Sequence, residues 1–133
     1  MAVTDADGRR RRRQGFTLIE MLVVLAIVAL LLTIAVPRYF GSLERSREVV
    51  LKTNLKTLRV TIDKFYADKG KFPESLEELV EQKYLLAIPV DPITDSKSSW
   101  LPVNSLDTNV LGIVDVKSGA PGQSTEGAPY ASY

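Results

Sequence analysis

The sequence predicts an α+β fold, in which a long N-terminal helix, first transmembrane and then amphipathic, packs against a small C-terminal antiparallel sheet. Three observations predict this fold. An apolar run fills residues 16–36, an apolar stripe at helical spacing continues to about residue 68, and two segments rich in β-branched residues lie nearer the C-terminus. The chain has 133 residues and no cysteine, so we expect one small head domain without disulfides.

The apolar run between Gly15 and Pro37 has the length of a membrane span. It carries one ionisable side chain, Glu20, and a helix of this length reaches about 30 Å, the thickness of the hydrocarbon core. It is longer than the apolar core of a secretory signal peptide, which has about 7 to 15 residues. Five arginines at positions 9–13 precede it. This basic flank predicts that the N-terminal end stays in the cytoplasm and that the remainder lies across the membrane.

The helix is expected to continue beyond Pro37 with a kink, because an internal proline removes one backbone hydrogen bond. Apolar residues then recur every three or four positions, which is typical of an amphipathic helix packed on a core. We expect this helix to end near Asp68, where Gly70 offers a C-cap. The stripe comprises Leu51, Leu55, Leu58, Ile62 and Phe65.

The rest of the head is predicted to hold one short helix and two strands. Ser75 and Glu78 match a capping box, which predicts a helix through about Lys83. The strands are expected at 100–103 and 110–116, with the sheet lying on the apolar stripe. In the second strand the alternation places valines 114 and 116 on one face, and Ile113 and Asp115 on the other.

Residues 15–24, with the sequence GFTLIEMLVV, resemble the class III signal of type IV pilins and of the pseudopilins of type II secretion systems. The segment 66–92 resembles the head of the major pseudopilin, the G type. The resemblance implies that a prepilin peptidase cuts after Gly15 and N-methylates the new N-terminal residue, Phe16.

The resemblance also implies a domain organisation and a location. Residues 1–15 would be a cleaved basic leader, 16–36 the transmembrane and filament-core helix, and 37–133 a periplasmic pilin-like head. The chain would span the bacterial inner membrane once, with the N-terminus cytoplasmic and the head periplasmic. After assembly it would lie in a periplasmic pseudopilus.

Glu20 needs a partner, because an unpaired charge inside a bilayer costs about 2.5 to 3.5 kcal/mol. The resemblance supplies one: the free amine of Phe16 in a neighbouring subunit. Pairing of the amine with the carboxylate would then set the stagger between subunits in a filament. The alternative is that Glu20 snorkels to water at the membrane edge.

Catalysis has little support in this sequence, which we predict is not an enzyme. It has no histidine and no cysteine, and it lacks the motifs of common nucleophiles and phosphate-binding loops. After residue 15, 12 Lys and Arg are outnumbered by 14 Asp and Glu. This small negative balance gives no reason to expect a nucleic-acid partner.

The resemblance further implies a calcium ion in the C-terminal loop. The candidate ligands are Asp115, Ser118 and Glu126, and three side chains fall short of the six to eight or so oxygens that calcium takes. We therefore assign no cofactor and keep calcium at these three residues as the alternative.

The function that the resemblance implies is that of a structural subunit. A pseudopilin polymerises into a periplasmic pseudopilus that drives protein export by a type II secretion system. Its partners would be further copies of itself, other pseudopilins, prepilin peptidase and an inner-membrane assembly platform. Two alternatives stay open: a subunit of a surface type IV pilus for adhesion, motility or DNA uptake, and a monomeric single-pass anchored binding module.

Overall fold

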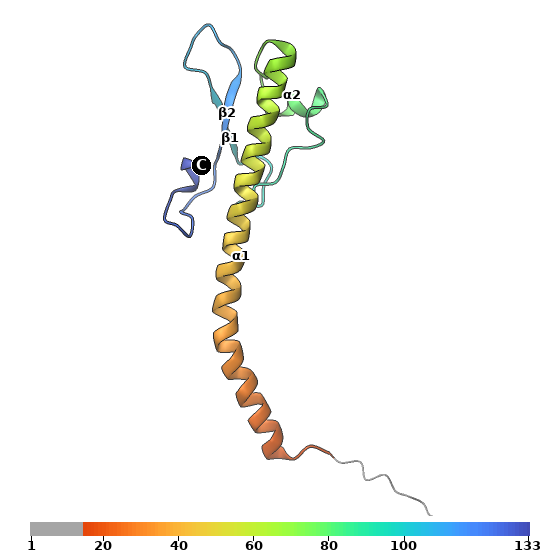
Figure 1. Cartoon of the computed structure of the whole chain (residues 1–133), viewed down its shortest axis with the longest axis vertical. Helices are drawn as coiled ribbons and strands as arrows, with labels where there is room; N and C mark the ends of the chain where they lie inside the picture. The colour runs from red at the N-terminus through yellow and green to blue at the C-terminus, as the bar shows by residue number, and fades with distance from the viewer. Residues whose placement is uncertain (1–14) are drawn as a thin grey trace, which may run out of the picture. The chain divides into compact units, whose positions relative to one another are not determined.

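The computed structural model describes residues 15–133, and the chain divides into two compact units that meet after Arg38. Helix α1 (Leu18–Lys69) belongs to both units, and the second unit, Tyr39–Tyr133, holds every other helix and strand (Figure 1). The expected leader, except for Gly15, lies outside the described residues.

In the first unit, residues 18–36 of α1 are apolar on every face, with Glu20 as the one ionisable residue. The side chains of residues 18–36 are exposed, and α1 is the one helix in residues 15–133 whose length and composition suit a membrane span. Pro37 lies inside the helix, so the proline does not end it, as the sequence predicts.

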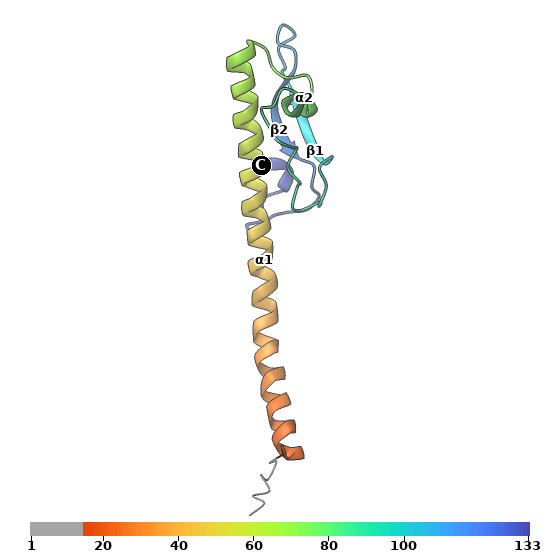
Figure 2. The ribbon, with the colours of Figure 1, turned by 90° about the vertical axis from the view of Figure 1, so that its right-hand side faces the viewer.

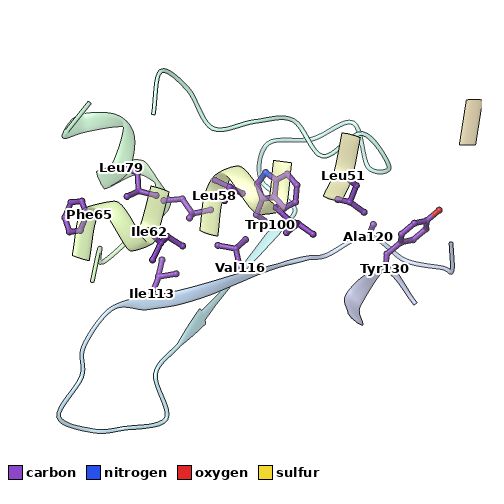
Figure 3. Close-up of a cluster of buried hydrophobic side chains, with 12 residues drawn as sticks. Leu51, Leu58, Ile62, Phe65, Leu79, Trp100, Ile113, Val116, Ala120 and Tyr130 are labelled. Atoms are coloured by element: carbon purple, nitrogen blue, oxygen red, sulfur yellow. The ribbon is translucent and has the colours of Figure 1, made fainter. Parts of the chain in front are cut away.

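In the second unit, α1 supplies the floor of the hydrophobic core. All five residues of the predicted stripe are buried, and Leu51, Leu58 and Ile62 have no exposed surface. Figure 3 shows side chains from the other elements gathered over this stripe, and Figure 2 shows β1, β2 and α2 along the same stretch of α1. The predicted α+β fold, with the sheet on the amphipathic helix, is confirmed. The covering residues are Leu76, Leu79, Trp100, Ile113, Val116, Ala120 and Tyr130.

The ends of both helices follow local chemistry. Gly70 has φ +70° and donates its N–H to the Tyr66 carbonyl at 2.8 Å, which closes α1 with a left-handed cap. Ser75 Oγ accepts the N–H of Glu78 at 3.3 Å at the start of α2 (Leu76–Glu81). Helix α2 ends at Glu81 and does not reach Lys83, the predicted end. Lys83 adopts φ +64°, a conformation that a helix does not contain.

The sheet has two antiparallel strands, β1 (Trp100–Asn104) and β2 (Ile113–Ser118). The prediction for the second strand is wrong in two respects, its bounds and its alternation. Val103 pairs with Asp115 and Asn104 with Ile113, so Val114 is an extra residue in a bulge. The bulge turns Ile113 to the same buried face as Val116.

Gly112 explains why β2 begins late. It has φ +107°, and a Cβ at this position would lie 2.8 Å from the Pro73 carbonyl oxygen and 2.9 Å from Phe72 Cβ. The neighbouring N–H of Ile113 donates to the same Pro73 carbonyl at 2.8 Å. The chain therefore packs backbone against backbone here, and the strand starts only after this contact.

Glu48 of α1 binds the C-terminal segment, residues 119–133. This side chain is buried, with 6% of its surface exposed. Its Oε1 accepts the backbone N–H of Thr125 at 2.6 Å, and its Oε2 accepts the Thr125 hydroxyl at 2.9 Å. The Thr125 N–H is the largest cause that lowers the pKa of Glu48; the hydroxyl and Lys52 act in the same direction, and burial opposes them.

We predict that Gly112→Ala destabilises the head by about 2 to 5 kcal/mol, because the new methyl group is both strained and overpacked. The control is Gly70→Ala, where φ is also positive but no atom lies within 4 Å of the Cβ position; we expect a loss of about 1 kcal/mol there. Denaturant unfolding of the full chain in detergent micelles measures both. Equal losses would contradict the close packing at Gly112.

We also predict that the stabilisation by Glu48 disappears in acid. A lowered pKa in the folded state means that the contribution is complete above the ordinary value of 4.5 and is lost as the pH falls through the folded value. The melting temperatures of the wild type and of Glu48→Gln, compared between about pH 7 and pH 3, should differ at neutral pH and converge below 4.5. A constant difference across this range would show that the charge of Glu48 is not involved.

Candidate functional site

The two residues of the predicted processing site lie just ahead of α1 and are open to solvent. Gly15 and Phe16 belong to neither a helix nor a strand. Phe16 is 77% exposed, and no atom lies within 4 Å of the Cβ position of Gly15. A peptidase binds backbone that is not already in secondary structure, so the bond between these two residues is accessible for cleavage.

The predicted assembly residue, Glu20, lies in the first turn of α1. Thr17 caps this helix: its Oγ1 accepts the N–H of Glu20 at 3.2 Å, and its carbonyl accepts the N–H of Met21 at 3.1 Å. The partial positive charge of a helix N-terminus favours a carboxylate in this turn. The structure therefore brings Gly15, Phe16 and Glu20 together at one end of a membrane-length helix.

The three candidate calcium ligands are not brought together. Asp115 and Ser118 lie three residues apart on β2, and successive side chains of a strand point to opposite faces. Glu126 is exposed in the C-terminal loop. In residues 15–133, no group of three or more acidic, histidine or cysteine side chains is placed to hold a metal ion.

Two of these candidates already have partners of another kind. Asp115 Oδ1 accepts a hydrogen bond from Arg59 Nε at 2.7 Å, which is also an ion pair. The Ser118 hydroxyl is fully buried and donates to Asp91 Oδ2 at 2.8 Å. These side chains do not fit a calcium site, because calcium requires several oxygens that converge on one point with free lone pairs.

Asp91 forms a turn in the loop ahead of β1 and also binds Ser118 of β2, a contact that the sequence did not predict. It is completely buried, and its Oδ1 accepts the N–H groups of Ile93 at 2.9 Å and Thr94 at 3.4 Å. With Ser118 on Oδ2, both carboxylate oxygens have donors. An aspartate followed by proline and turn residues is a known signal for this Asx-type turn, but its bond to a strand 27 residues away is not visible in the sequence.

The sequence did not predict a role for Glu48 either, although its position on α1 indicates that it is buried. The buried stripe on α1 advances by three or four residues, and Glu48 lies three residues before Leu51, so it occupies the next position of the same stripe. A polar residue at a core position of an amphipathic helix is expected to have a hydrogen-bonding partner. Thr125 is that partner.

Comparison with known proteins agrees with this geometry. A family model described as the prokaryotic N-terminal methylation motif matches residues 10–36. The type II secretion system core protein G of Pseudomonas aeruginosa is 30% identical over 100 residues, which cover 63% of this chain and 70% of that protein. The protein of the same name from Vibrio cholerae is 28% identical over 135 residues, covering 89% of this chain and 92% of the relative.

A type IV pilin is also similar. The type IV major pilin protein PilA of Myxococcus xanthus is 37% identical over 68 residues, and the chain spans only 31% of that longer protein. No solved structure matches the chain with statistical significance. The methylation motif, the pilin-like α+β fold and the similarity over most of the length of the Pseudomonas protein agree. The chain therefore belongs to the type IV pilin-like family of the type II secretion system core protein G.

Proposed function

We propose that this chain is a pseudopilin that polymerises into a periplasmic pseudopilus and drives protein export by a type II secretion system. One observation carries the proposal: the methylation motif, residues 10–36, contains an exposed bond between Gly15 and Phe16 directly ahead of a membrane-length helix, in a chain of the core protein G family. The protein acts as a structural subunit and not as an enzyme, in keeping with relatives named as a pilin and as secretion-system core proteins.

Processing prepares the chain for assembly. Prepilin peptidase cuts between Gly15 and Phe16 and N-methylates Phe16, which removes the arginines at 9–13. The new amine then lies beside the N-terminus of α1, where the helix dipole disfavours a positive charge. A carboxylate from another subunit relieves this repulsion, and Glu20 is the one acidic residue in the apolar run.

Assembly uses the first unit of the chain. The apolar side chains of residues 18–36 are all exposed, so they require either lipid or other copies of the same helix. Packing of these helices forms the filament core, and the pair of Phe16 and Glu20 sets their stagger, a registry role in which specificity matters more than net stability.

The location follows from the same segment. The chain spans the inner membrane once, with its arginine-rich end in the cytoplasm and its head in the periplasm. Its partners are further copies of itself, other pseudopilins, prepilin peptidase and an inner-membrane assembly platform. The absence of a basic balance after residue 15 gives no support for a nucleic-acid partner.

A surface type IV pilus is the second candidate function, and the similarity to the Myxococcus pilin favours it. A pilin shares the processing site and the helical filament core, so both functions make the same use of Phe16 and Glu20. A monomeric anchored module, the third candidate, uses neither of these residues for assembly and retains its leader.

We predict that the mature protein begins at N-methylated Phe16. Intact mass spectrometry and N-terminal analysis of the protein extracted from membranes of its native host measure this directly. A mature chain that still carries residues 1–15 would contradict processing and would favour the monomeric anchor.

We predict that Glu20→Ala is inserted and processed normally but forms no filaments and stops export into the medium, because the amine of Phe16 loses its partner. Asp63→Ala is the control, since it removes an exposed carboxylate from the head part of α1. Filaments are measured by electron microscopy and exported proteins by assay of the medium. Normal filaments from Glu20→Ala would refute the registry role, and loss of surface pili with normal export would favour the pilus.

A further inference from the structure

The C-terminal segment, residues 119–133, has little regular structure of its own. It contains the short 3-10 helix η1 (Tyr130–Ser132) and an isolated bridge between Gln123 and Pro129. Ser124 closes a small loop by donating its N–H to the Ala128 carbonyl at 2.8 Å. Such a segment stays ordered only when contacts with the rest of the head hold it.

The contacts with α1 come from one stretch of that helix. Glu48 binds Thr125 through both carboxylate oxygens. One turn later, Lys52 places its ammonium 4.8 Å from the ring centroid of Tyr133, a cation–π contact. Tyr130, between these two points, is buried in the core. Figures 1 and 2 both show the C-terminus beside α1.

The polarity of the Glu48 contact is opposite to that of a cation site. The loop directs an N–H and an O–H hydrogen toward α1, and the helix provides the negative charge. A calcium loop does the reverse, because it directs oxygen lone pairs toward a central positive charge. Bonds of a carboxylate to such donors are among the stronger hydrogen bonds in proteins.

A positive charge is also already present where Asp115 lies. The Arg59 guanidinium binds Asp115 through Nε and the Val116 carbonyl through Nη2 at 3.0 Å. It links α1 to β2 as a bound cation would, and a calcium ion at Asp115 would have to displace it or bear its repulsion. The carboxylate that Ser118 contacts, that of Asp91, already accepts hydrogen bonds on both of its oxygens.

We propose that Glu48 fastens the C-terminal segment to α1 in place of a metal ion, so that the head keeps this segment ordered without calcium. Arg59 makes the corresponding link to β2. The inference concerns the head alone and does not rest on polymerisation or export. In this positioning role, Glu48 holds the segment as calcium does in the resembled family. It does so with a negative charge, whereas calcium carries a positive one.

Hydrogen exchange of the full chain in detergent micelles tests the proposal, with mass spectrometry of peptides from residues 119–133. We expect the wild type to exchange equally in EGTA and in millimolar calcium chloride. Glu48→Gln should speed exchange in these peptides by roughly an order of magnitude, because a buried charged hydrogen bond is lost. Peptides from α2 should not change. Glu44→Gln, which neutralises an exposed carboxylate one turn earlier, is the matched control and should behave as the wild type.

Slower exchange or a higher melting temperature of the wild type in calcium would overturn the proposal, and so would wild-type exchange in Glu48→Gln. If Glu48→Gln does not fold, Thr125→Val replaces it, because this change removes only the hydroxyl bond to Oε2 and keeps the backbone bond. Thr125→Val should then speed exchange of the segment, and unchanged exchange would refute the role of Glu48. Glu126→Gln should leave the exchange of the segment unchanged. If Glu126 were a calcium ligand, this variant would instead weaken calcium binding.

Discussion

Burial of the apolar stripe of α1 is the interaction on which the rest of the head depends. A fully buried leucine or isoleucine contributes about 1.5 to 3 kcal/mol, and Leu51, Leu58 and Ile62 have no exposed surface. The other elements are too small to be stable alone. Helix α2 has six residues and the sheet has two strands, and such pieces persist only when they cover a larger apolar surface.

Burial has no direction, so polar residues of α1 decide which other segments lie against the helix. Asn54 Nδ2 donates to the Val90 carbonyl at 2.9 Å, Arg59 binds Asp115, and Glu48 binds Thr125. The partners lie 36, 56 and 77 residues further along the chain. The bonds tie two loops and strand β2 to the same helix, and together they define which face of the C-terminal half meets α1.

The two parts of α1 present different surfaces. Residues 18–36 are apolar on every side and remain exposed, which suits lipid or other copies of the helix. After Tyr39 the helix is amphipathic and its apolar side is covered within the chain. This difference suits the proposed assembly, because the exposed part can exchange lipid for other copies of the helix while the covered part keeps its fold.

Local patterns in the sequence were sufficient for α1, for the cap at Ser75, for the fold class and for the motif around Gly15 and Glu20, since each depends on residues a few positions apart. The sequence by itself thus determined the membrane-length helix, the processing motif and the pilin-like α+β fold. Only the tertiary structure decided the bulge at Val114, the pairing of Asp91 with Ser118 and the engagement of Asp115 by Arg59. The physical reason is that these contacts join residues far apart in the chain, and periodicity carries no information about such partners.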